Sequence, residues 1–115
     1  MKCNRGDVVL VLFPDSNLQT AKRRPALVVQ ANHLKTGLPQ TIVVMITSNM
    51  ARDGHASRVR IPLGTPGGLQ SGLRTESIVM TDNLATVFDA EIDRVIGSLS
   101  DMAAVDAALR NTLGI

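Results

Sequence analysis

Three consecutive cations stand directly before a proline and an apolar run in residues 22–30. Pro25 has no N–H and biases Arg24 toward an extended backbone. The pattern therefore predicts a basic loop that leads into a buried strand over residues 26–30. The guanidinium of Arg24 is planar, permanently charged and able to donate hydrogen bonds in pairs, which suits a phosphate group. The competing interpretation is an ordinary solvated basic loop, since exposed charges are the norm in proteins.

Two hydroxyl groups, those of Thr47 and Ser48, end a different apolar run. If the two strands pair, these hydroxyls and the Arg24 guanidinium meet at one edge of the sheet. Asp82 follows a further apolar run and could supply an acidic group there. Each feature also has a purely structural interpretation, because hydroxyls after a strand often bond the local backbone and an aspartate before an asparagine suits a turn.

Standard catalytic signatures are missing from the sequence, including a nucleophile elbow, a glycine-rich phosphate loop and a histidine pair at metal spacing. His33 and His55 are the only histidines, and both stand in predicted loops. Imidazole groups can act as acid and base in phosphodiester cleavage, but solvated loop residues are the simpler interpretation. The one cysteine, Cys3, allows no internal disulfide. We therefore expect no metal site and no cofactor.

Short apolar runs separated by turn residues continue along the chain and predict strands. The expected strands cover residues 7–13, 26–30, 41–47, 57–61, 76–81, 84–88 and 95–99. The run over residues 57–61 alternates polar and apolar positions, which predicts one wet, cationic face. Residues 15–22 are expected to form a polar turn, residues 62–75 a long glycine-rich connection, and residues 89–94 a helical turn.

A helix is the last expected element. Ser100 can cap its N-terminus, and Asp101 suits its first turn. Apolar residues at spacings of three and four form one stripe, made of Met102, Val105, Leu109 and Leu113. Gly114 supplies the stop. Many short strands and one terminal helix predict a small, mostly antiparallel β-barrel of the α+β class, in a single domain over residues 1–115.

The net charge of +2 is unevenly distributed along the chain. Residues 1–75 contain ten Lys or Arg and three Asp, whereas residues 76–115 contain two Arg and seven acids. This asymmetry indicates a polyanion-binding face. Only 2% of the residues are aromatic, so the stacking platforms of many single-strand RNA binders are missing. The apolar runs are too short to span a membrane and the start lacks the apolar core of a signal peptide, so we expect a cytoplasmic protein.

The order of several short motifs resembles the MazF/PemK (Kid-like) toxin family. The resemblance covers essentially the whole length and keeps the family order. The segments that carry it are RGDV at 5–8, FPDSNL at 13–18, KRRPALVV at 22–29, ITS at 46–48, GLRTESIV at 72–79 and TDNLATV at 81–87.

The resemblance implies an SH3-like barrel with a C-terminal helix that forms a homodimer. It also implies the toxin of a type II toxin–antitoxin system. Such a toxin is a metal-independent, sequence-specific endoribonuclease that cuts single-stranded RNA, chiefly messenger RNA. A cognate antitoxin would block it by laying an extended acidic segment across the RNA groove.

The resemblance also implies catalytic roles for Arg24 and Thr47, with Asp82 as the first candidate for the general base. Attack of an RNA 2′-hydroxyl on its own phosphate needs positioning and charge stabilisation above all. Arg24 would stabilise the charge of the phosphorane, and Thr47 would donate a hydrogen bond to a phosphate oxygen. The residues expected to bind RNA around them are Gln19, Lys22, Arg23, Ser48 and Arg58.

Departures from the family pattern leave two other functions open. Ala85 stands where many members have arginine, Met80 where some have arginine, and residues 19–20 replace an acidic or Glu-Gln pair. One alternative is a non-catalytic toxin of the same barrel that binds a protein target such as DNA gyrase. The other is an RNA-binding regulator that has lost catalysis. Arg24 together with Thr47 favours the nuclease, because a protein poison has no chemical need for this pair.

Overall fold

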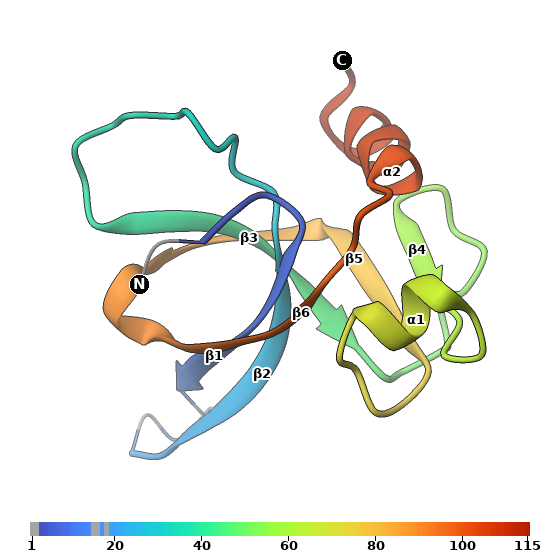
Figure 1. Cartoon of the computed structure of the whole chain (residues 1–115), viewed down its shortest axis with the longest axis horizontal. Helices are drawn as coiled ribbons and strands as arrows, with labels where there is room; N and C mark the ends of the chain where they lie inside the picture. The colour runs from blue at the N-terminus through green and yellow to red at the C-terminus, as the bar shows by residue number, and fades with distance from the viewer. Residues whose placement is uncertain (1–2, 15–16, 18) are drawn as a thin grey trace.

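Six antiparallel strands form one strongly curved sheet, and a C-terminal helix packs beside it (Figure 1). The structure is a computed structural model that describes residues 3–14, 17 and 19–115. Its elements are β1 (Asp7–Pro14), β2 (Ala21–Val28), β3 (Gln40–Thr47), β4 (Arg58–Ile61), α1 (Pro66–Gln70), β5 (Ser77–Phe88), the 3₁₀ turn η1 (Asp89–Glu91), β6 (Ile92–Ser98) and α2 (Ala103–Leu113). Neither helix of this described part is long and apolar enough to cross a membrane.

The strands are ordered β4-β5-β3-β2-β1-β6 across the sheet. Within the described ranges the two edge strands, β4 and β6, do not pair with each other, so the sheet curls without closing. The predicted mostly antiparallel β architecture with a terminal helix is confirmed, and the predicted barrel takes the form of this open, curled sheet.

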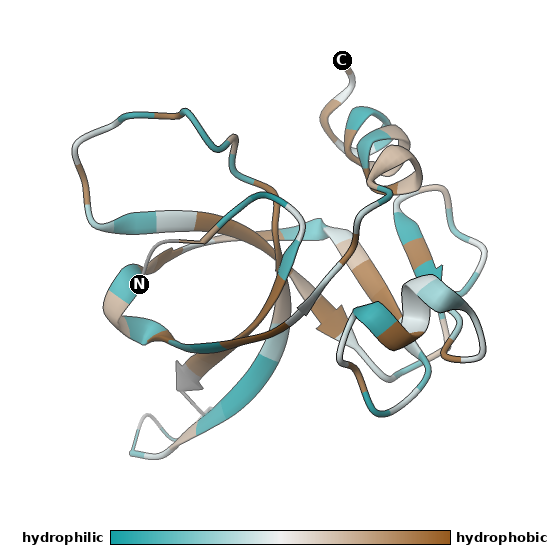
Figure 2. Ribbon diagram, viewed as in Figure 1, coloured by the Kyte–Doolittle hydropathy of each residue, from teal (hydrophilic) through white to brown (hydrophobic). Residues whose placement is uncertain are grey.

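Both faces of the sheet are buried over its central strands, which explains why β1 and β3 contain continuous apolar runs. In β1, Val9 and Val11 belong to one apolar cluster while Val8 belongs to the other. The second cluster includes Val105, through which α2 covers its face of the sheet. A strand covered on both faces needs apolar residues at every position, so the period-two alternation of a half-exposed strand is lost. Figure 2 shows the apolar stretches concentrated in the middle of the strands.

Strand β2 is longer than predicted, because β1 offers it a partner along its whole length. It begins at Ala21 instead of residue 26, and Ala21 lies opposite Pro14 in the β1–β2 ladder. Three residues of the predicted turn, 15, 16 and 18, lie outside the described residues. The three cations of residues 22–24 are therefore part of a strand, and Pro25 stands inside it. Figure 2 shows this outer part of β2 as a hydrophilic stretch.

Strand β5 replaces two predicted strands, and the predicted turn between them is a bulge. Opposite it, Val44 pairs with Leu84 while the next residue of β3, Met45, pairs with Met80, so three residues of β5 have no partner on β3. The buried Thr81 fixes this bulge, because its hydroxyl donates to the carbonyl oxygen of Ser57 at 2.7 Å. A bulge bends and twists a strand without ending it.

The helices correct two further predictions. The glycine-rich connection contains the short helix α1. An N-cap threonine and a following proline explain this helix, because Thr65 accepts a hydrogen bond from the N–H of Gly68 at 3.1 Å. Helix α2 begins at Ala103, and Asp101 rather than Ser100 accepts from its first N–H, at 3.0 Å. The predicted stop is confirmed, because Gly114 has a left-handed backbone with φ of 69°.

Candidate active-site groove

A groove of about 780 Å³ opens where strands β2 and β3 separate. Their ladder stops at the pair Ala26–Met45. The next residue of β2 is Pro25, which has no N–H for a further rung. Beyond this point β2 stays paired with β1, and β3 stays paired with β5, so the two neighbouring strands diverge.

The groove brings together the two sequence segments that could do chemistry. Arg24 from β2, Thr47 at the end of β3 and Ser48 directly after it line the same space, as predicted from the ends of the two apolar runs. The other polar lining comes from β2, the loop between α1 and β5, the start of β5, and β6, and consists of Arg23, Arg74, Thr75, Ser77 and Arg94. Among the described residues that line it, none is a carboxylate or an imidazole. The groove therefore presents four guanidinium groups and several hydroxyls, a chemistry suited to a polyanion.

The hydroxyl of Thr47 is held in place as an acceptor. Its Oγ1 accepts a hydrogen bond from the backbone N–H of Asn49 at 3.1 Å. This contact is the local strand-end bond expected of such a threonine, yet it leaves the hydroxyl proton available. Thr47 is half-buried and lies at the end of β3, so the proton can be donated to a ligand in the groove.

One carboxylate outside the lining restrains two of the four arginines. Asp93 Oδ2 accepts from Nε of Arg23 at 3.0 Å, and Nε of Arg94 lies 3.9 Å from the same oxygen. No ion pair between described residues involves Arg24 or Arg74. The groove thus keeps a surplus of positive charge.

The whole chain resembles known toxins in sequence. The family model described as "PemK-like, MazF-like toxin of type II toxin-antitoxin system" matches residues 4–113. The chain belongs to this family. It is 32% identical over 107 residues to the endoribonuclease MazF6 of Mycobacterium tuberculosis, covering 90% of each chain. It is also 35% identical over 98 residues to a probable endoribonuclease MazF of Mycolicibacterium smegmatis, covering 84% of each.

Solved toxin structures share the fold at lower sequence identity. A mycobacterial endoribonuclease in complex with its cognate antitoxin aligns with a TM-score of 0.76 at 21% identity, over 98% of this chain and 96% of that one. A MazE–MazF complex from Deinococcus radiodurans aligns with a TM-score of 0.76 at 18% identity, over 100% of this chain and 99% of that one. The curled sheet with its C-terminal helix is therefore a fold known from this toxin family.

Asp82, the residue expected to be the general base, lies outside the lining of the groove. It stands on the bulge of β5, where Arg58 binds it with two contacts, Nε to Oδ1 at 2.8 Å and Nη2 to Oδ2 at 3.1 Å. The hydrogen bond from Arg58 lowers the pKa of the Asp82 carboxyl, and the charge of Arg58 adds to this effect. A carboxylate so stabilised is a weak proton acceptor. Arg58, expected to bind RNA, is engaged in the same pair.

Two further residues expected to bind RNA, Gln19 and Lys22, are exposed near the β1–β2 connection but are not among the residues that line the groove. Of that group, Arg23 and Ser48 do line it. Within the ranges that the structure describes, no group of three or more His, Cys, Asp or Glu residues could hold a metal ion.

Sequence reasoning missed Arg74 and Arg94 as residues of the groove. Arg74 stood in a predicted connection and Arg94 at the end of a predicted helical turn, so neither had a partner that would place it. Only the strand order shows that β6 lies two strands away from β2 and that its arginine reaches the same space. A cation next to a strand was the available signal, but it was shared by many other residues.

Proposed function

We propose that this chain is a single toxin domain that cleaves single-stranded RNA in the groove between β2 and β3. The observation that carries the proposal is the presence of Arg24, Thr47 and Ser48 in one cationic groove. The mycobacterial relatives named as endoribonucleases support it. They do not favour the alternative of a toxin that binds a protein target such as DNA gyrase.

Arg24 stabilises the negative charge that grows on the phosphate as the 2′-hydroxyl attacks. A guanidinium can donate two parallel hydrogen bonds to two phosphate oxygens, and it remains charged throughout. Thr47 donates its free hydroxyl proton to a phosphate oxygen, while the N–H of Asn49 fixes the direction of that hydroxyl. Donors fixed in advance stabilise a transition state without the cost of reorganising.

Proton transfer is left without an assigned side chain. The role predicted for Asp82 stays a prediction, and its pairing with Arg58 does not support it. The described lining of the groove offers arginines and hydroxyls, so the rate enhancement comes from positioning the attacking hydroxyl and from charge stabilisation. This chemistry requires no metal ion, and we expect cleavage to continue in the presence of a chelator.

The proposal includes two protein partners. A cognate antitoxin with an acidic segment would neutralise the surplus charge of the groove, and the solved mycobacterial complex with an antitoxin supports such a partner. A homodimer follows from the family resemblance, and a strictly monomeric mass at micromolar concentration would contradict it. Cellular RNA as substrate implies that the toxin acts in the cytoplasm.

The test is incubation of antitoxin-free protein with a long single-stranded RNA in the presence of a chelator, followed by mapping of the cut ends. We expect discrete cuts at a shared short sequence. Arg24→Ala should lower the cleavage rate by about a thousandfold, the scale of removing a preorganised charge-stabilising donor. The fold should survive, because an exposed arginine contributes little to stability.

The matched control is Arg60→Ala, which removes the same charge from an exposed residue outside the groove. It should cut at the wild-type rate. Full cleavage by Arg24→Ala, or equal loss in both variants, would contradict the assignment of the site.

A further inference from the structure

Two arginines of the groove, Arg74 and Arg94, have no role in the chemistry just described. Arg94 lies on β6 opposite Leu10 of β1, and Leu10 lies opposite Pro25 of β2. Neighbouring strands are about 4.8 Å apart, so the Arg94 backbone is about 10 Å from that of Pro25, the neighbour of Arg24. Arg94 therefore enters the groove from β6, two strands away from the strand that carries Arg24.

Arg74 is held near Arg94 by a backbone contact that only glycine permits. The loop after α1 packs directly on β6, where a Cβ at Gly72 would overlap the carbonyl oxygen of Ile96. A Cβ at Gly97 would overlap the backbone of Ser71 in the same way. These two glycines allow close backbone contact between the loop after α1 and strand β6. Both arginines lie within three residues of this contact.

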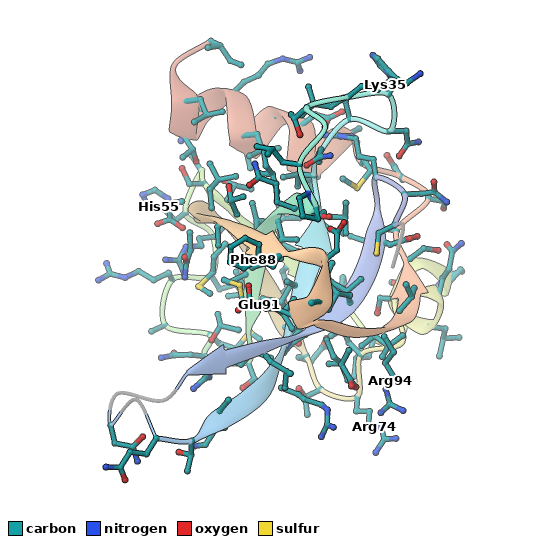
Figure 3. All side chains as sticks on the ribbon, turned by 90° about the vertical axis from the view of Figure 1, so that its left-hand side faces the viewer. Lys35, His55, Arg74, Phe88, Glu91 and Arg94 are labelled. Carbon is teal, nitrogen blue, oxygen red and sulfur yellow. The ribbon has the colours of Figure 1, made fainter. Side chains whose placement is uncertain are left out.

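The guanidinium groups of Arg74 and Arg94 line one groove, and carboxylates compensate their charge little. Figure 3 shows the labelled side chains of Arg74 and Arg94 extending on the same side of the molecule, and both line the groove. The carboxylate nearest to Arg94 is Asp93, whose Oδ2 lies 3.9 Å from its Nε and is already engaged by Arg23 at 3.0 Å. For Arg74, no ion pair with another described residue is formed.

We propose that Arg74 and Arg94 together bind one phosphate of the RNA next to the phosphate held by Arg24 and Thr47. The inference rests on the proposed function and names a second subsite of the same groove. Two cations at one place repel each other unless an anion lies between them, and a guanidinium pair matches the oxygens of one phosphate. These arginines are positioning residues, because they fix the register of the RNA strand and do not contact the reacting atoms.

Binding is tested with Arg74→Gln and Arg94→Gln, each against Arg110→Gln, which removes an exposed arginine of α2 far from the lining of the groove. The probe is a 2′-O-methyl RNA that contains the cleavage sequence, because it lacks the attacking hydroxyl. Each groove variant should bind about five- to tenfold more weakly, the scale of one net hydrogen bond or exposed ion pair. In the double variant Arg74→Gln/Arg94→Gln, the slope of log affinity against log salt should fall by about 0.7, the value for one phosphate of a single strand. Arg110→Gln should match the wild type.

Cleavage kinetics separate a positioning role from a catalytic one. Each groove variant should raise KM by the same factor as the loss of binding and leave kcat within about twofold of the wild type. Substrates shortened from either end supply a second readout: the truncation that weakens wild-type binding by removing the flanking phosphate should have no further effect in the double variant Arg74→Gln/Arg94→Gln.

Equal affinity of Arg74→Gln, Arg94→Gln and Arg110→Gln, together with an unchanged salt slope in the double variant, would overturn the inference. So would a fall in kcat with unchanged binding. These outcomes are distinct from failure of the proposed function, which would appear as an absence of cuts by the wild type or as full cutting by Arg24→Ala. The binding experiment with 2′-O-methyl RNA does not depend on cleavage.

Discussion

The groove and strand β4 both present arginines, but the two regions differ in the number of carboxylates that lie beside those arginines. On β4, Arg58 is bound by Asp82, and Arg60 lies 3.0 Å from Asp53 and 3.8 Å from Glu76. In the groove, the carboxylate of Asp93 pairs with two of the four arginines, Arg23 and Arg94, and no ion pair between described residues involves the other two. The arginines of β4 are therefore neutralised by carboxylates, whereas those of the groove remain available for an anion.

This difference shows how the charge asymmetry of the sequence translates into the fold. The acids that neutralise β4 include Glu76 and Asp82 from β5 and its approach, whereas the sequence predicted a wet, cationic face there. The strand order places β5 directly beside β4. The acidic second part of the chain thus neutralises the cations of β4, whereas the four arginines of the groove keep a surplus of positive charge.

The largest expected difference in cleavage rate between the two regions comes from replacing an arginine by lysine, which changes the geometry of the cation but keeps its charge. Arg24→Lys keeps the charge but loses the planar fork that can bind two phosphate oxygens. We expect its kcat on RNA to fall by about a hundredfold or more. Arg60→Lys on β4 should cleave at the wild-type rate. If Arg24→Lys retained wild-type activity, the groove would act only as a source of charge.

The Thr47 hydroxyl should show the next largest effect. Thr47→Val keeps the shape and removes the donor, so we expect kcat to fall about ten- to a hundredfold. Thr47→Ser, which keeps the hydroxyl, should stay within about fivefold of the wild type. A thermal melt controls for the lost acceptor of the Asn49 N–H, which costs about 1 kcal/mol. Equal activity of the Val and Ser variants would exclude a role for the hydroxyl.

Asp82→Asn examines whether the β4 region takes part in catalysis at all. Because Asp82 lies outside the lining of the groove and is paired with Arg58, we expect kcat to stay within about twofold of the wild type. Cleavage of the mapped RNA is the measurement. A loss of a hundredfold or more without loss of fold would join the two regions into one site and restore Asp82 as the general base.

The smallest expected effect is the stability contributed by that ion pair. Because Arg58 lowers the pKa of Asp82 in the folded state, the pair stabilises the protein above the ordinary carboxyl pKa. This contribution is lost as the pH falls through the lowered pKa of the folded state. Urea unfolding should show Asp82→Asn less stable than the wild type by under about 1 kcal/mol at pH 7, since the carboxylate is solvent-exposed. The difference should vanish in strong acid.

Most of the strands could be predicted from sequence, because an apolar run between turn residues favours a buried strand through local preferences alone. The ends of β2 could not be predicted, since Arg23 and Arg24 have no local preference that distinguishes a loop from a strand paired along β1. The bulge of β5 was read as a turn for a similar reason: the sequence Asp-Asn suits both, and only the contact of Thr81 with Ser57 selects the bulge.

The meeting of Arg24 and Thr47 could be predicted because each stands at the end of an apolar run, close to the point where the β2–β3 ladder stops. Residues recruited through strand order could not be predicted. Arg94 enters the groove because β6 pairs with β1, and Arg74 enters because Gly72 and Gly97 let a loop rest on that strand. Neither relation leaves a mark in the local sequence.

The divergence of β2 from β3 also has a consequence for solubility. Beyond Ala26, one edge of β2 has no strand neighbour among the described residues, so its backbone N–H and C=O groups form an open template for foreign strands. Proteins protect such edges with charged side chains and proline, and this segment carries Lys22, Arg23, Arg24 and Pro25. The cations of this segment, with Arg24 of the proposed RNA site among them, are therefore also expected to keep copies of the toxin from joining edge to edge. Neutralising them to obtain an inactive protein is expected to promote aggregation.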